Sequence, residues 1–324
     1  MNPQLDLFRD PAPAAVANGE RETSNAQERL AALANRLPAS LRLGASSWAP
    51  ASQEDGEDPR LPPDRDVPGG GLQAYARHPL LRTVGLDTTF YAPIPESDFR
   101  RHAQLVPADF RFVVKAPQSL TAAYLFEARE PSAHFLDARA AIDLFIGPCL
   151  AGLGPAAGPL VFQFPPQGRK ATCDPSRFAA RLARFLGGLP RGPLYAVELR
   201  DRALLGPETM RALADANARL CLAVHARMPA VAVQAAAATS LGTGSLVLRW
   251  YLHASPGHRQ PTSGTGPRNR LVEEDPATRA AIAALVRERI ALGEEAWVIA
   301  QGDALEPAAR TLERLACAIL PEAR

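Results

Sequence analysis

Ionisable residues recur in this chain where short apolar runs end. Lys115 ends the run FRFVVK, Glu198 lies near the end of LYAVEL, and Arg249 lies near the end of SLVLRW. Such runs are typical of strands that are buried on both faces, where an unpaired charge costs several kcal/mol. Charged groups at these positions therefore belong either to a stabilising network or to a functional site.

Acid–base chemistry is the first function that these residue types offer. Glu198 is the candidate general base or nucleophile, because alternation along its strand points the carboxylate inward. Lys115 is a second catalytic candidate, and Asp87 and His225 are candidates for a secondary acid or base. No H-x-x-x-H type of spacing accompanies them, so no metal site is predicted and the cofactor stays open.

Anion binding is the second function that the strand ends offer. Lys115, Arg200 and Arg249 would bind an anion or stabilise negative charge that develops during a reaction. Further polar and aromatic residues at or just beyond strand ends are expected to line the same site: Gln163, Trp48, Tyr91, His253 and Gln301.

A structural role is the alternative for each of these residues taken alone. Glu198 and Arg200 could form an ion pair that only closes the top of a barrel. Lys115 could simply end a strand in water, and His225 could be a core histidine with its hydrogen bonds satisfied. The two aromatic residues could be packing. What favours a site is that so many polar groups recur at equivalent positions.

The elements that must position these residues alternate between strand and helix. Strands are predicted at 41–46, 82–87, 110–115, 159–164, 194–199, 219–224, 245–250 and 295–300. Helices are predicted at 27–37, 71–78, 95–105, 131–147, 175–187, 206–217, 229–239, 276–292 and 304–319. Eight such units favour a closed (β/α)8 TIM barrel of the α/β class. An open sheet would more often show six strands and a Gly-rich first turn, and no G-x-G-x-x-G follows the first strand.

The chain divides into two parts. Residues 1–27 are polar and rich in Ala, Pro, Asn and Glu, so we expect a flexible N-terminal arm. Residues 28–324 would form the barrel domain. Two Pro- and Gly-rich insertions, 49–70 and 254–270, follow strands and would lie on the face that carries active sites in such barrels. Surface loops without a role are the alternative.

Composition limits the function classes. The 324 residues carry a formal net charge of +2, which does not indicate direct nucleic-acid binding or a membrane surface. Four scattered cysteines without a C-x-x-C pair indicate neither a disulfide framework nor a zinc knuckle, and they favour a reducing, cytoplasmic location. We find no signal-peptide pattern and no apolar stretch of about 18 residues that would span a membrane.

Five segments occur in an order and spacing that resemble a known family. They are LRLGASSW, VGLDTTFYAPIPESDF, PADFRFVVKAPQSLT, PLVFQFPPQ and YAVELRDRALL. They resemble the family called domain of unknown function seventy-two, and the resemblance runs from about Leu41 to about Leu315. It implies a TIM barrel and gives no reaction, since the family's activity is not established.

The resemblance extends to some strand-end residues and fails at others. The residues that match the family pattern are Lys115, Gln163, Glu198, Arg200 and Arg249. Family members usually have glutamate where this chain has Gly85, asparagine at Asp87, aspartate at His225, and asparagines or a histidine at Gln301 and Gly302. The resemblance therefore supports chemistry based on Lys115 and Glu198, but not chemistry that needs a glutamate at position 85.

The N-terminal arm contains a separate motif, QLDLF, formed by Gln4, Leu5, Asp6, Leu7 and Phe8. It resembles the pentapeptide by which bacterial polymerases and repair proteins bind the DNA sliding clamp, at all five positions. The glutamine would hydrogen-bond at the rim of a pocket while the apolar side chains enter a cleft. The alternative is an arm that folds back onto its own barrel through the same residues.

Three functions are consistent with these observations. The first is an enzyme, a hydrolase or lyase that acts on an anionic, phosphorylated, sugar-like or nucleotide substrate at the mouth of the barrel. The second is a non-catalytic binding protein that is recruited to replication or repair sites through the sliding clamp. The third is a structural barrel whose charges at the mouth form one satisfied network.

Overall fold

The computed structural model describes residues 25, 27–48, 71–125, 130–168, 174–252, 276–302 and 305–320. Several sequence predictions lie outside the described residues: the QLDLF peptide of residues 4–8, the insertions at 49–70 and 254–270, and His253.

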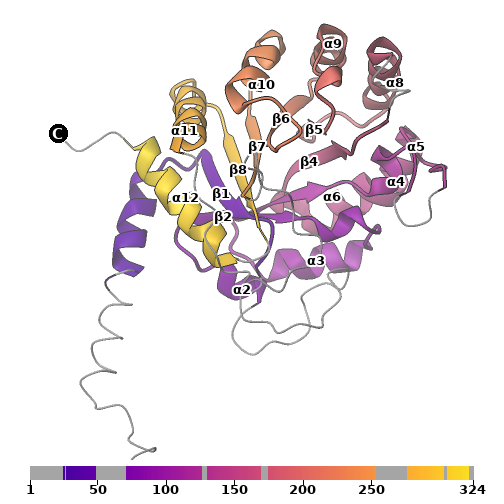
Figure 1. The fold of residues 1–324 in the computed structure, drawn as a ribbon. Helices are drawn as coiled ribbons and strands as arrows, with labels where there is room; N and C mark the ends of the chain where they lie inside the picture. The colour runs from indigo at the N-terminus through magenta and orange to yellow at the C-terminus, as the bar shows by residue number, and fades with distance from the viewer. Residues whose placement is uncertain are drawn as a thin grey trace, which may run out of the picture.

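Eight parallel strands form a closed barrel in which each strand pairs with the next and the last pairs with the first (Figure 1). This confirms the predicted (β/α)8 TIM barrel. The strands are β1 Leu41–Ala45, β2 Leu81–Leu86, β3 Arg111–Lys115, β4 Ala157–Phe164, β5 Tyr195–Leu199, β6 Arg219–Val224, β7 Leu246–Tyr251 and β8 Ala296–Gln301. Their carboxyl ends all point to one face of the barrel, because parallel strands share one direction.

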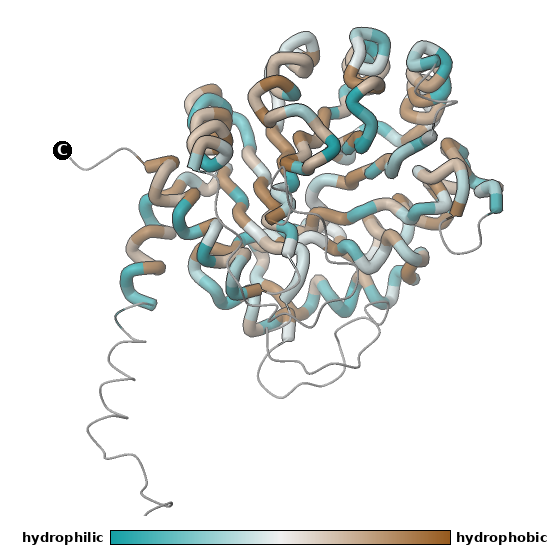
Figure 2. Tube along the Cα trace, viewed as in Figure 1, coloured by the Kyte–Doolittle hydropathy of each residue, from teal (hydrophilic) through white to brown (hydrophobic). Residues whose placement is uncertain are grey.

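Helices surround the strands (Figure 1). Residues 27–36 are helical before the first strand. The α-helices that follow are α2 Leu72–Tyr75, α3 Glu96–Gln104, α4 Gln118–Thr121, α5 Ala138–Ala141, α6 Gly147–Leu153, α8 Pro175–Gly187, α9 Pro207–Asp215, α10 Val231–Ala237, α11 Pro276–Ala291 and α12 Leu305–Ile319. In Figure 2 the outer helices carry both brown and teal stretches, as expected for helices with one buried face. No helix among these described residues is long and apolar enough to cross a membrane.

The segment predicted as one helix at 131–147 is different in the structure. The helix begins only at Ala138, where the carboxylate of Asp137 accepts the N–H of Ala140 at 3.1 Å. It then widens into a π-helical turn, Ile142–Ile146, before α6. Pro148 lies at the start of α6 and has no N–H to donate, which accounts for a break in regular α-helical bonding just before it.

The closure between β1 and β2 depends on a side chain from a helix. The register shifts between Leu43 and Gly44, and a Cβ at Gly44 would lie only 2.1 Å from the carbonyl oxygen of Thr83. The hydroxyl of Tyr75 in α2 accepts the N–H of Ala45 at 2.7 Å and donates to the Thr83 carbonyl at 2.8 Å. This hydroxyl satisfies backbone groups that the irregular pairing leaves free.

Candidate active site

The interior of the barrel consists of an apolar layer with a polar layer above it. The apolar layer is one buried cluster of Val113, Val161, Ala196, Cys221, Val247, Trp297 and Ile299. Strand side chains alternate, so residues two positions further along the same strands point into the same interior. The polar residues among them are Lys115, Gln163, Glu198, Arg249 and Gln301. All five were predicted as site residues, and the strand register brings them to one end of the barrel.

Arg249 is the centre of this polar layer. Its Nη1 lies 2.8 Å from Glu198 Oε2, and its Nη2 lies 2.7 Å and 2.5 Å from the two oxygens of Asp87. Gln301 Nε2 donates to Asp87 Oδ2 at 3.0 Å. The guanidinium is buried and bonded to two carboxylates, and together they hold the pKa of Arg249 well above its ordinary value, although burial alone would lower it. Arg249 therefore stays charged, and the two carboxylates compensate its charge.

Glu198 is fully buried, and both of its oxygens have partners. Oε2 accepts from Arg249, while Oε1 lies 2.5 Å from Arg200 Nη2 and 3.3 Å from the hydroxyl of Tyr251. Burial would raise the pKa of Glu198, but Arg249, Arg200 and Lys115 overcome it and lower the pKa to about 2. The carboxylate stays ionised and is held in place.

Arg200 follows β5 and lies over an aromatic ring. Its Cζ lies 4.1 Å from the ring centroid of Tyr251, a cation–π contact. One nitrogen pairs with Glu198, but the buried Nε has no hydrogen-bond partner among the described residues. A buried guanidinium nitrogen without an acceptor costs free energy, which an incoming acceptor would recover.

Lys115 supplies the remaining cation. Its Nζ lies 3.7 Å from the ring centroid of Phe90, and no carboxylate of the described residues forms an ion pair with it. Burial lowers the pKa of Lys115 to about 8; Arg249 and Arg200 act in the same direction, and Asp87 and Glu198 oppose them. At this pKa about a tenth of the amine is neutral at pH 7 and about half at pH 8.

The charges in this layer do not balance. Lys115, Arg200 and Arg249 are three cations, whereas Asp87 and Glu198 are two carboxylates. His225 follows β6, and its ring lies edge-on to Tyr251 with centroids 5.4 Å apart. Burial, then Arg200, lowers the pKa of His225 to about 4, so it is neutral near pH 7. This buried layer therefore carries excess positive charge.

Two of the predicted residues do not join this cluster. Trp48 is buried, and its ring packs against His102 of α3 at 6.0 Å, on the helix side of the sheet. Tyr91 is 53% exposed and contacts only the neighbouring Phe90 ring, at 5.7 Å, among the aromatic contacts that the structure describes. Among the described residues we find no contact of either side chain with the charged layer.

Sequence reasoning missed two aromatic residues of the site. Tyr251 contacts Glu198, Arg200 and His225. Period-2 alternation from Arg249 would have indicated it, because both side chains then point to the same side of β7. Phe90 lies in a 3-10 turn, Thr88–Phe90, and such a position carries no strand periodicity from which to predict it.

Gly85 marks the position where the family usually has glutamate. A Cβ at Gly85 would lie 3.2 Å from Cγ2 of Ile299, so this position points into the barrel and a β8 side chain occupies the space beside it. A glutamate here would require Ile299 to move.

Among the described residues, no group of three His, Cys, Asp or Glu side chains is arranged to hold a metal ion.

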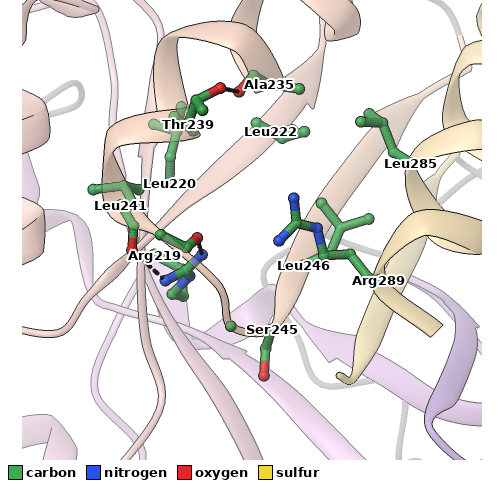
Figure 3. A pocket seen from close by; sticks show the side chains of 13 residues that line it. Arg219, Leu220, Leu222, Ala235, Thr239, Leu241, Ser245, Leu246, Leu285 and Arg289 are labelled. Atoms are coloured by element: carbon green, nitrogen blue, oxygen red, sulfur yellow. Dashed lines mark hydrogen bonds between the residues drawn. The ribbon is translucent and has the colours of Figure 1, made fainter. Parts of the chain in front are cut away.

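A hollow of about 50 Å³ lies at the opposite end of β6 and β7 from the charged layer, between α10 and α11 (Figure 3). Its two arginines are occupied. Arg219 donates to the carbonyls of Leu241 and Gly242, at 3.2 and 3.1 Å, and Arg289 pairs with Glu294 at 3.2 Å. These bonds fix the loop before β7, and the hollow offers no cation without a partner.

Comparison with known proteins agrees with this architecture. Residues 42–322 match the family described as "Protein of unknown function DUF72". The chain belongs to this family. None of the curated proteins matches the chain.

Solved structures of DUF72 proteins resemble this chain in fold. Two crystal structures of a DUF72 family protein from Enterococcus faecalis are 15% identical to it. Their TM-scores are 0.57 and 0.51. The two alignments cover 87% and 86% of this chain and 97% and 95% of the respective crystal chains. At this identity the likeness concerns the fold alone. A DUF72 family protein from Thermotoga maritima has a TM-score of 0.47 and 17% identity, over 85% of this chain and 97% of its own.

Proposed function

We propose that the mouth of the barrel is the active site of an enzyme that acts on a small anionic substrate. The observation that carries this proposal is the excess positive charge, with Lys115 lacking an ion pair and Arg200 lacking an acceptor for Nε among the described residues. Buried cations without counter-ions are costly, and an anionic ligand would supply the missing partner.

The roles of the residues differ from those expected from sequence. Glu198 was the candidate general base, but its two oxygens are bonded to Arg249, Arg200 and Tyr251, and a pKa of about 2 makes it a weak base. We assign it instead the task of holding the two arginines in place. Lys115, whose amine is partly neutral, takes the acid–base or nucleophilic role.

This assignment favours a lyase over a hydrolase. Most glycoside hydrolases use two carboxylates in separate roles, whereas Asp87 and Glu198 are both bonded to Arg249. A lysine amine can form a Schiff base with the carbonyl group of a substrate whose negative charge an adjacent arginine binds. Such an arrangement suits bond cleavage next to a carbonyl group better than it suits hydrolysis. The anionic substrate could still be phosphorylated, sugar-like or a nucleotide, and the residues that follow β7 would then help to bind it.

A thermal-shift panel tests the proposal. Phosphate, malonate, lactate and pyruvate would each be titrated against the full chain, and we expect at least one to raise Tm. Lys115→Met should lose that increase, whereas Arg202→Met, at an exposed site just beyond β5, should keep it. If no anion shifts the wild type more than Lys115→Met, the proposed function is wrong.

Recruitment by the sliding clamp is a second proposal, carried by the complete QLDLF match at Gln4–Phe8. It is independent of the barrel. A fluorescent peptide of residues 1–12 would be titrated against a bacterial sliding clamp, and we expect saturable binding that Leu7→Ala and Phe8→Ala abolish. Absence of binding, or equal binding by the variants, would contradict it.

A further inference from the structure

We propose that Lys115 is a nucleophile that forms an imine with the carbonyl carbon of a small 2-oxo acid, whose carboxylate binds Arg200. This inference rests on the proposed function, because it requires an anion at the mouth. It adds the substrate class and a covalent step.

The residue type at position 115 is the first argument. The chain holds 36 lysines and arginines, of which only Lys115 and Lys170 are lysine. A chain that uses arginine at almost every cationic position keeps lysine at the mouth of the barrel. Arginine cannot lose its proton in a protein, whereas a buried lysine can, and only a neutral amine attacks a carbonyl.

The surroundings of the amine are the second argument. Nζ lies over the Phe90 ring, and the described carboxylates nearby are already bonded to arginines. An amine that is desolvated and lies beside other cations is activated as a nucleophile. The pKa of about 8, with burial as its largest cause and Arg249 and Arg200 contributing, agrees with this.

Arg200 supplies the means to hold a carboxylate. Nη2 pairs with Glu198 and Cζ lies over the Tyr251 ring, so two contacts hold the guanidinium before any ligand arrives. The buried Nε lacks an acceptor among the described residues. A carboxylate that accepts from Nε would satisfy this donor. Arg200 is paired with Glu198, and Lys115 points into the same barrel interior as Glu198, so the carbonyl group next to that carboxylate would lie on the side of the Lys115 amine.

The covalent step balances without any oxidant or reductant. The neutral amine of Lys115 adds to the carbonyl carbon and forms a C–N bond, and one N–H proton moves to the former carbonyl oxygen. That oxygen takes a second proton from solvent and leaves as water. The product is an iminium ion with one remaining N–H proton. It withdraws electrons from the bonds next to it, which is the chemistry that a lyase needs.

Reductive trapping tests the inference. The full chain would be incubated with pyruvate, reduced with sodium cyanoborohydride, digested and mapped by mass spectrometry. We expect a reduced pyruvate adduct on Lys115, with little on Lys170, and none in Lys115→Arg. Arg200→Lys should slow trapping about tenfold, because it removes the Nε donor. The trapping rate should rise with pH through about 8, as the Lys115 amine becomes neutral.

Lactate, which lacks the carbonyl group, separates the two proposals. If pyruvate and lactate both raise Tm but no adduct forms on Lys115, the imine is wrong and the proposed function stands. If neither raises Tm and no adduct forms, both fail. Equal labelling of Lys115 and Lys170 would also overturn the imine, because it would show that the reaction does not select Lys115.

Discussion

Arg249 and Glu198, 51 positions apart in the chain, form a 2.8 Å ion pair that is sealed inside the barrel. Asp87 binds the other side of the guanidinium, and Arg200 binds the other oxygen of Glu198. The result is a chain of four charges from β2, β5 and β7. Lys115 lies beside this chain without joining it by an ion pair to any described residue. This bonded frame and the Lys115 amine beside it are the features from which the function is proposed.

Glu198→Gln should be strongly destabilising. It removes the charge that compensates two buried arginines, so we expect the free energy of unfolding to fall by about 3–5 kcal/mol. Urea unfolding measures this. Glu208→Gln, an exposed residue in the first turn of α9, is the matched control and should change stability by about 0.5 kcal/mol or less. Similar losses in both variants would contradict the assigned role of Glu198.

Acid should remove the contribution of Glu198. Its pKa is about 2 in the folded protein against an ordinary 4.5, so the unfolded state binds the proton more readily. The stabilisation, on the order of 3 kcal/mol, is therefore complete above about pH 5 and is lost as pH falls toward 2. The difference in unfolding free energy between wild type and Glu198→Gln should narrow over this range. A difference that stays constant with pH would show that the pKa is not depressed.

Lys115→Met should stabilise the protein while it removes anion binding. The ammonium is partly buried without an ion pair to any described residue, and we expect a gain of about 1–2 kcal/mol at pH 7. The pKa is lowered from 10.5 to about 8, so the unfolded state binds more protons between these values and wild-type stability rises with pH there. The difference in unfolding free energy between Lys115→Met and wild type should therefore shrink as pH rises from about 8 to 10.5. Urea unfolding at several pH values measures it, and the control Arg202→Met should show no such trend.

Asp87→Asn should increase the positive charge at the mouth. Asp87 raises the pKa of Lys115 and opposes burial, so its removal should lower that pKa further and tighten lactate binding a few-fold. Reductive methylation with isotope-labelled methyl groups and NMR would report the titration of Lys115, with Lys170 as internal reference. An unchanged titration midpoint would mean that Asp87 lies too far from Lys115 to influence it.

The sequence was sufficient for the barrel and for most of its charged layer. Buried parallel strands read as apolar runs, so Lys115, Glu198 and Arg249 stood out against them. It could not reveal which charges neutralise each other, because the contacts of Arg249 join residues up to 162 positions apart. That is why Glu198, which points inward as expected, could be taken for a base. The sequence also could not show that the Trp48 ring packs against His102 of α3, because strand periodicity does not extend past the end of β1.

A crystal structure of the complex with lactate tests the central claim most directly. Lactate carries the carboxylate but cannot form an imine, so it reports anion binding alone. We predict its carboxylate within hydrogen-bond distance of Arg200 Nε, with the rest of the molecule beside Lys115 Nζ. A mouth that stays without lactate at saturating concentration, or lactate bound only elsewhere on the molecule, would contradict the account.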